Sequence, residues 1–168
     1  MIKFKLRYLA FVVLAIFLVG CFGPSIYSFK TKLPSNKWAY KPGKVDRHKS
    51  EQMIVKGSNG AISINIIRVN QTVARKNLDE AVKAFKKDLK EMKYKDVGEK
   101  VYKNAKWKLL STEHKAYNII IKELVAFTNK GKSEIGVFFT GTPKSLEKYK
   151  ADFYKVVESL EIIPDKKK

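Results

Sequence analysis

Residues 116–141 read AYNIIIKELVAFTNKGKSEIGVFFTG, two apolar strand patterns joined by a turn signal. Apolar side chains fill consecutive positions over residues 119–121 and 124–127 instead of alternating with polar ones. A strand with this pattern has both of its faces covered and lies in the middle of a sheet. The segment Asn129–Lys132 is typical of a hairpin turn. These residues therefore predict central antiparallel strands over 116–128 and 133–141.

The same reasoning extends outward to weaker strand patterns. Gly57-Ser58-Asn59-Gly60 predicts a hairpin turn between two of them, and Pro34 ends the first. Residues 44–51 are polar, and we expect a surface loop there. The expected strands cover residues 28–33, 53–55, 61–69, 98–103 and 106–112.

The stretch from Asn77 to Tyr94 predicts a helix. Asn77 is a suitable N-cap, and Glu80 follows three residues later, as in a capping box. Apolar residues recur at helical spacing, which predicts one buried stripe. The stripe consists of Leu78, Ala81, Val82, Phe85, Leu89 and Met92.

Thr142-Pro143 predicts the start of a second helix, because threonine caps a helix and proline suits its first position. Its apolar residues also form one stripe. They are Leu146, Tyr149, Phe153, Val156 and Val157. We expect Phe85 and Phe153 to be buried, one from each helix, against a single sheet.

The first 21 residues have three parts. Basic residues precede an apolar run over residues 9–19, and Gly20-Cys21 closes it. This is the layout of a secretory signal. The string Leu18-Val19-Gly20-Cys21 resembles the lipobox of bacterial lipoproteins. The resemblance implies cleavage after Gly20 and a lipid, palmitate included, on the thiol of Cys21.

Two other interpretations of this segment stay open. An uncleaved transmembrane anchor is one, although the apolar run over residues 8–22 is shorter than the roughly 20 residues that a span needs. The other is an ordinary signal peptide with a chance cysteine. A lone free thiol is unusual in an exported protein, and lipidation removes it. We therefore expect a signal peptide over 1–20, a lipidated tether over 21–25, a domain over 26–163 and a basic tail over 164–168.

The chain is strongly basic, with 35 lysine and arginine residues against 16 acidic ones and a net charge of +19. Three of the basic residues lie in the predicted signal, so removing them from +19 leaves +16. Such a charge is common in nucleic-acid-binding proteins, but export argues against that partner. It favours anionic lipids, envelope polymers or acidic envelope proteins, or else it is simply a solvated surface. The candidate contacts to an anionic surface are Lys30, Lys32, Lys83, Lys87 and Lys90.

The order of elements resembles the PsbP-like family, which includes bacterial lipoproteins such as DcrB. The resemblance rests on the early strand ending at Pro34, the helix led by Asn77-Leu78-Asp79-Glu80, the antiparallel meander and the helix after Gly141-Thr142-Pro143. It implies an α+β fold, an antiparallel sheet with helices packed on both faces. It also implies action by binding other proteins or assisting a membrane complex, and it carries no shared active site.

Residues that support catalysis or metal binding are sparse. His48 follows Asp46 and Arg47, and His114 follows Glu113, but neither has the spacing of a metal site. The chain has no cysteine besides Cys21, and no phosphate-binding or nucleophile motif is present. We therefore predict no catalytic, cofactor or metal site. The expected function is a lipid-anchored, extracytoplasmic binding or assembly module, not an enzyme. The alternative is an enzyme that acts on an envelope substrate.

Overall fold

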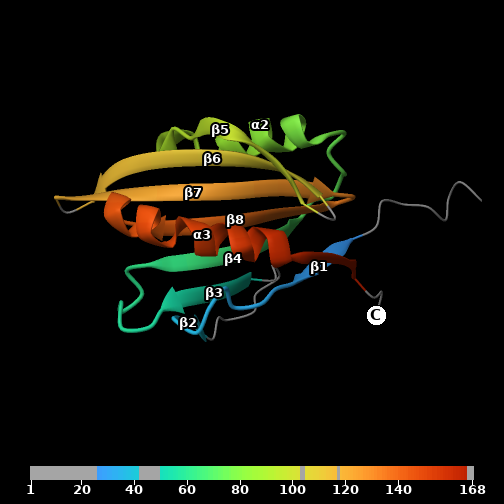
Figure 1. The fold of residues 1–168 in the computed structure, drawn as a ribbon. Helices are drawn as coiled ribbons and strands as arrows, with labels where there is room; N and C mark the ends of the chain where they lie inside the picture. Colours follow the sequence, from blue (N-terminus) through green and yellow to red (C-terminus); the bar gives the residue numbers. More distant parts are fainter. Residues whose placement is uncertain (1–25, 42–49, 103–104, 117, 166–168) are drawn as a thin grey trace, which may run out of the picture.

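The computed structural model describes residues 26–41, 50–102, 105–116 and 118–165. Seven strands form one antiparallel sheet in the order β2-β3-β4-β8-β7-β6-β5, and β1 pairs with β9 in a two-stranded sheet (Figure 1). The α+β class is therefore confirmed. The strands are β1 (Tyr27–Lys30), β2 (Trp38–Lys41), β3 (Ser50–Val55), β4 (Ser63–Asn70), β5 (Lys95–Tyr102), β6 (Ala105–Ala116), β7 (Ile119–Lys130), β8 (Ser133–Gly141) and β9 (Glu161–Pro164).

The predicted hairpin at the centre of the sheet is confirmed. β7 pairs with β8 from Lys130↔Ser133 to Lys122↔Gly141, and Gly131 in the turn between them has a φ of 57°. Residues 124–128 of β7 are all buried, as a centrally placed strand covered on both faces requires. The turn between β3 and β4 is also present, with left-handed backbone at Gly57, Asn59 and Gly60.

Two clusters of buried side chains form around this sheet, and each includes side chains from one helix. Successive residues of a strand point to opposite faces. In β7, Leu124 and Ala126 belong to the larger cluster with α3 (Pro143–Ser159), whereas Val125 belongs to the smaller cluster with α2 (Leu78–Asp88). Figure 1 shows α3 crossing in front of β7 and β8.

The second helix agrees with its prediction. The side chain of Thr142 accepts a hydrogen bond from the backbone N–H of Ser145, at 3.3 Å, and Pro143 occupies the first turn. All five residues of the predicted stripe are buried, and Phe153 is completely so. Trp38 fixes this helix further, since its indole N–H donates to Asp152 Oδ2 at 2.9 Å.

The first helix is shorter than predicted. Asn77 caps it by accepting from the backbone N–H of Glu80 at 2.9 Å, but α2 ends at Asp88 instead of reaching Tyr94. A 3₁₀ turn, η1 (Lys90–Met92), follows. The chain must reverse here to begin β5, and Lys93 does so with a left-handed φ of 50°.

The shortened helix changes the burial of its stripe. Ala81 and Val82 are buried, and Phe85 is half-buried against the smaller cluster. Leu89 lies at the end of the helix and is 39% exposed. The prediction that Leu89 joins the core is therefore wrong, because the apolar stripe continues past the end of the helix. Phe85 packs against the smaller cluster but is only partly buried, so its predicted burial is confirmed in part.

The β6–β7 hairpin extends beyond its neighbours on both sides. β5 pairs with β6 only as far as Ser111, and β8 pairs with β7 only as far as Lys122. Within the described part of the chain, residues 114–116 and 119–121 therefore pair only with each other. Ile119 and Ile120 are 54% and 48% exposed. The central-strand pattern wrongly assigned them to a covered region, because sequence cannot show where the neighbouring strands stop.

The two ends of the described chain lie side by side on the domain. β1 pairs antiparallel with β9, and the backbone N–H of Asp165 donates to the carbonyl of Ile26 at 2.8 Å. Arg68 Nη1 lies 2.6 Å from Asp165 Oδ2 and 3.1 Å from the carbonyl of Tyr27. Residues 164 and 165, which sequence analysis assigned to the tail, are thus held on the domain.

Candidate functional site

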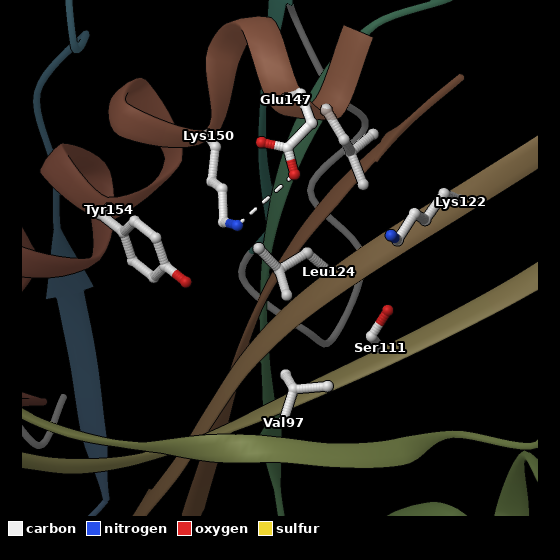
Figure 2. A pocket seen from close by; sticks show the side chains of 8 residues that line it. Val97, Ser111, Lys122, Leu124, Glu147, Lys150 and Tyr154 are labelled. Atoms are coloured by element: carbon white, nitrogen blue, oxygen red, sulfur yellow. Dashed lines mark ion pairs between the residues drawn. The ribbon is translucent and has the colours of Figure 1, made fainter. Parts of the chain in front are cut away.

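A pocket of about 190 Å³ lies between α3 and the strands β5, β6 and β7 (Figure 2). Apolar and polar side chains share its lining. Leu124 and Leu146 are buried, while Val97 is half-exposed. The lining residues are Val97, Ser111, Lys122, Leu124, Leu146, Glu147, Lys150 and Tyr154.

The strands bring three of these residues to one face by register. Ser111 of β6 pairs directly with Leu124 of β7, and Lys122 lies two residues away on the same face. Val97 reaches the pocket from β5, where a bulge interrupts the pairing between Asp96 and Gly98. A bulge of this kind changes the direction of a side chain.

The helix supplies the opposite wall. Glu147, Lys150 and Tyr154 are spaced three and four residues apart, so they form one ridge on α3. Figure 2 shows their side chains extending from α3 over Leu124. The ridge lies beside the apolar stripe and borders the pocket, and Tyr154 also packs against the edge of the larger cluster.

The pocket is positive, because it contains two amines and one carboxylate. Lys150 Nζ lies 3.5 Å from Glu147 Oε1, and this pair is largely exposed. Within the described part of the chain, no carboxylate lies at ion-pair distance from Lys122 Nζ. In the same part of the chain, neither the hydroxyl of Ser111 nor that of Tyr154 makes a hydrogen bond. Three polar groups at this site thus have free hydrogen-bonding capacity.

A second polar group of residues surrounds Glu123 and faces the α2 side of the sheet. The hydroxyl of Tyr94 donates to Glu123 Oε2, and that of Thr140 donates to Glu123 Oε1 at 2.9 Å. Burial raises the pKa of Tyr94, and the hydrogen bond to Glu123 adds to the rise. The carboxylate is thus already bound by two hydroxyls, which suits a structural role.

His114 is not among the residues that line the pocket. His114 is half-buried on the projecting hairpin, opposite Ile121, and its Nδ1 has no hydrogen-bond partner in the described part of the chain. His48, with Asp46 and Arg47, lies outside the described residues. No group of three potential metal-ligating side chains occurs within the described ranges.

The predicted anchor residues Gly20 and Cys21 also lie outside the described residues. Among the described helices, none has the length and apolar character needed to cross a bilayer. The structure does place the predicted surface lysines. All five are exposed, but they lie on different elements: Lys30 in β1, Lys32 just after it, Lys83 and Lys87 on α2, and Lys90 in η1.

Sequence reasoning did not identify the pocket residues. Glu147, Lys150 and Tyr154 have the spacing of one helix face, which was the only local signal. Ser111 and Lys122 are polar residues within strands, and such residues are usually solvent-facing. Their proximity to α3 depends on the order of the strands in the sheet, which local patterns do not determine.

The comparisons with known proteins give a family and a fold. A family model described as the HrcA protein C-terminal domain matches residues 45–168. No curated protein has a sequence that matches this chain.

Three solved structures resemble the chain. One is the mycobacterial protein LpqN, which is described as involved in cell envelope biogenesis of Mycobacterium tuberculosis. Its TM-score is 0.59 at 8% identity, and the match covers 86% of this chain and 88% of the LpqN chain. Cyanobacterial PsbP (CyanoP) from Synechocystis has a TM-score of 0.54 at 10% identity, covering 84% and 95%.

The third is a Bacteroides thetaiotaomicron protein with a TM-score of 0.54 at 14% identity. It covers 87% of this chain, which spans 50% of that protein. At these identities the likenesses describe the fold alone, and they support a PsbP-like fold.

Proposed function

The chain belongs to the HrcA C-terminal domain family through the match over residues 45–168, and we propose that it is a lipid-anchored, non-enzymatic binding module of the bacterial cell envelope. The family match begins after β2, so the lipobox-like segment and the first two strands lie outside it. The proposed lipid on Cys21 holds the domain at the membrane. The domain itself, an α/β/α sandwich with one helix on each face of the sheet, binds a membrane complex or an anionic envelope surface.

One observation carries the proposal: the first and last described residues meet at one end of the domain. The backbone N–H of Asp165 donates a hydrogen bond to the carbonyl of Ile26, and the sequence continues from Asp165 into three lysines. Only four residues separate Cys21 from Ile26. A span of five residue steps reaches at most about 18 Å, so a lipid on Cys21 keeps this basic end next to the membrane.

The neighbouring structures support this proposal. LpqN is described as an envelope-biogenesis protein, and it has the same fold. The alternative of an enzyme would use the polar residues around Glu123. That carboxylate is already bound by the hydroxyls of Tyr94 and Thr140, which favours the binding module.

The decisive experiment is lipid labelling of the full chain in bacterial cells. We expect labelled palmitate to enter the protein and to remain with it in the membrane fraction. The variant Cys21→Ser should lose the label and appear as unprocessed precursor or as released protein. Label that survives in Cys21→Ser would contradict the anchor.

A pull-down then tests the binding role. The anchored protein and the Cys21→Ser form are each captured from membranes, and the proteins that come with them are identified. We expect a membrane-complex component to be captured with the anchored form. Capture of the same proteins with both forms would mean that the anchor does not determine the partner.

A further inference from the structure

The pocket beneath α3 combines an apolar base with polar groups that have free hydrogen-bonding capacity. Leu124 and Leu146 are 8% and 5% exposed, so little of either reaches solvent. Around them stand the amine of Lys122 and the hydroxyls of Ser111 and Tyr154. In Figure 2 the amine of Lys122 and the hydroxyl of Tyr154 lie on opposite sides of Leu124, and the hydroxyl of Ser111 points toward Lys122.

The charges of this pocket favour a singly charged anion. Glu147 already neutralises Lys150 at 3.5 Å, which leaves the charge of Lys122. A dianion such as a phosphate monoester would be repelled by Glu147 and would find no arginine for bidentate contact. A cation would meet Lys122 and Lys150. A carboxylate suits the site, since it accepts from one amine and from hydroxyl groups at once.

The volume and the apolar residues define the rest of the ligand. Pockets for drug-sized ligands measure about 300–1,000 Å³, so a pocket of about 190 Å³ holds only the end of a molecule. Val97, half-exposed at the bulge of β5, offers an apolar contact. A short hydrocarbon group beside the carboxylate would therefore bury against Leu124, Leu146 and Val97.

We propose that this pocket binds a carboxylate carried on a short apolar chain, with Lys122 as the charged contact and Tyr154 and Ser111 as hydrogen-bond donors. Free short-chain acids and the C-terminal carboxylate of an apolar peptide share this chemistry. The inference rests on the proposed function, because it names a ligand class for the binding module. It uses the pocket residues and not Cys21, so an experiment can contradict the pocket proposal and leave the anchor proposal standing, or the reverse.

The test uses the full chain in nanodiscs of neutral phosphatidylcholine and a trifluoro-labelled hexanoate observed by fluorine NMR. We expect saturable line broadening by the wild-type protein and a dissociation constant raised about tenfold by Lys122→Gln, the loss typical of a charge-assisted hydrogen bond. Tyr154→Phe should weaken binding less. Lys83→Gln makes the same charge change on α2 and should leave binding unaltered.

Further probes separate the source and the charge. A tripeptide ending in leucine is compared with its C-terminal amide, and tighter binding than hexanoate would identify a peptide end as the ligand. The corresponding trifluoro-labelled amine should not bind. Thermal melts establish that each variant is folded. Equal binding of acid and amine, equal losses in Lys122→Gln and Lys83→Gln, or no binding of either carboxylate would overturn the proposal.

Discussion

The position of Tyr94 in the fold changes the acidity of its phenol. It follows the left-handed turn at Lys93, and it is buried among the residues that pack under α2. Burial raises the pKa of its phenol, as do the hydrogen bond to Glu123 and the charge of that carboxylate. Each of these factors disfavours the phenolate, so the folded protein retains the proton of Tyr94 to higher pH than an unfolded chain does.

This difference predicts a fall in stability at alkaline pH. Below the ordinary tyrosine pKa of about 10, the phenol is neutral in both states and its contribution is fully present. Above that pH the unfolded chain releases the proton while the folded one keeps it, so the free energy of unfolding decreases. We expect Tyr94→Phe to show a shallower decrease than the wild type between about pH 9 and 11. Urea unfolding measured across this range checks it, and equal slopes for the two proteins would contradict it.

The two helices differ in how deeply they pack. Phe153 of α3 stacks on Phe139, with ring centroids 5.8 Å apart, and is completely buried. The ring of Phe85 in α2 packs against those of Phe127 and Tyr94, with ring centroids 5.1 and 5.2 Å apart, but Phe85 is only half-buried. The longer helix therefore contributes more apolar burial than the shorter one.

Truncation of these two rings should show the difference. We expect Phe153→Ala to cost about 3–5 kcal/mol, the usual range for a core aromatic residue. Phe85→Ala should cost on the order of 1–2 kcal/mol, because only part of its ring leaves water on folding. Chemical denaturation of both variants gives the comparison. An equal loss in both would mean that α2 packs as deeply as α3.

The same contrast explains which elements could be predicted. The stripe of α3 ends where the helix ends, so its five buried residues followed from spacing alone. In α2 the apolar spacing continues past Asp88, and only the need to turn into β5 stops the helix. The pattern at Ile119 and Ile120 is that of a central strand, but their burial depends on the neighbouring strands. The pairing of β5 with β6 stops at Ser111, and that of β8 with β7 stops at Lys122. The pocket draws on four distant elements, so sequence spacing did not indicate it.

At the scale of the whole molecule, the positive charge is not at a single end. Tyr27, near the chain's first described residue, donates its backbone N–H to Ser133 Oγ at 2.8 Å, and Lys130 Nζ lies 4.9 Å from its ring centroid. Lys90 lies close to Met92, whose carbonyl accepts from Thr112. Thr112 in turn pairs with position 123 of β7. Position 123 is seven residues from Lys130, so the neighbourhood of Lys90 and that of Tyr27 are about 23 Å apart along β7.

This separation divides the predicted surface lysines. Charges at physiological salt act over about 8 Å, so a membrane beside Tyr27 is too far from Lys90 to attract it. Lys30 is three residues along β1 from Tyr27, about 10 Å away, so it lies much nearer to the membrane end than Lys90 does. Under the proposed anchor, we therefore infer that the lysines of α2 and η1 contribute less to membrane binding than those at the chain ends.

Two matched variants of residues 22–168, which contain the whole described core, test this inference. Replacing Lys166, Lys167 and Lys168 with glutamine removes three charges next to Asp165, and replacing Lys83, Lys87 and Lys90 removes three from the other region. Each lysine near an anionic surface contributes about 1 kcal/mol. The first variant should therefore bind anionic vesicles up to roughly a hundredfold more weakly at low salt, and the second should bind nearly as the unmodified domain does. Co-sedimentation with anionic and neutral vesicles, at low and high salt, measures both. If the two variants lose affinity equally, the domain has no preferred orientation, and if neither form distinguishes anionic from neutral vesicles, the positive charge is a solvated surface.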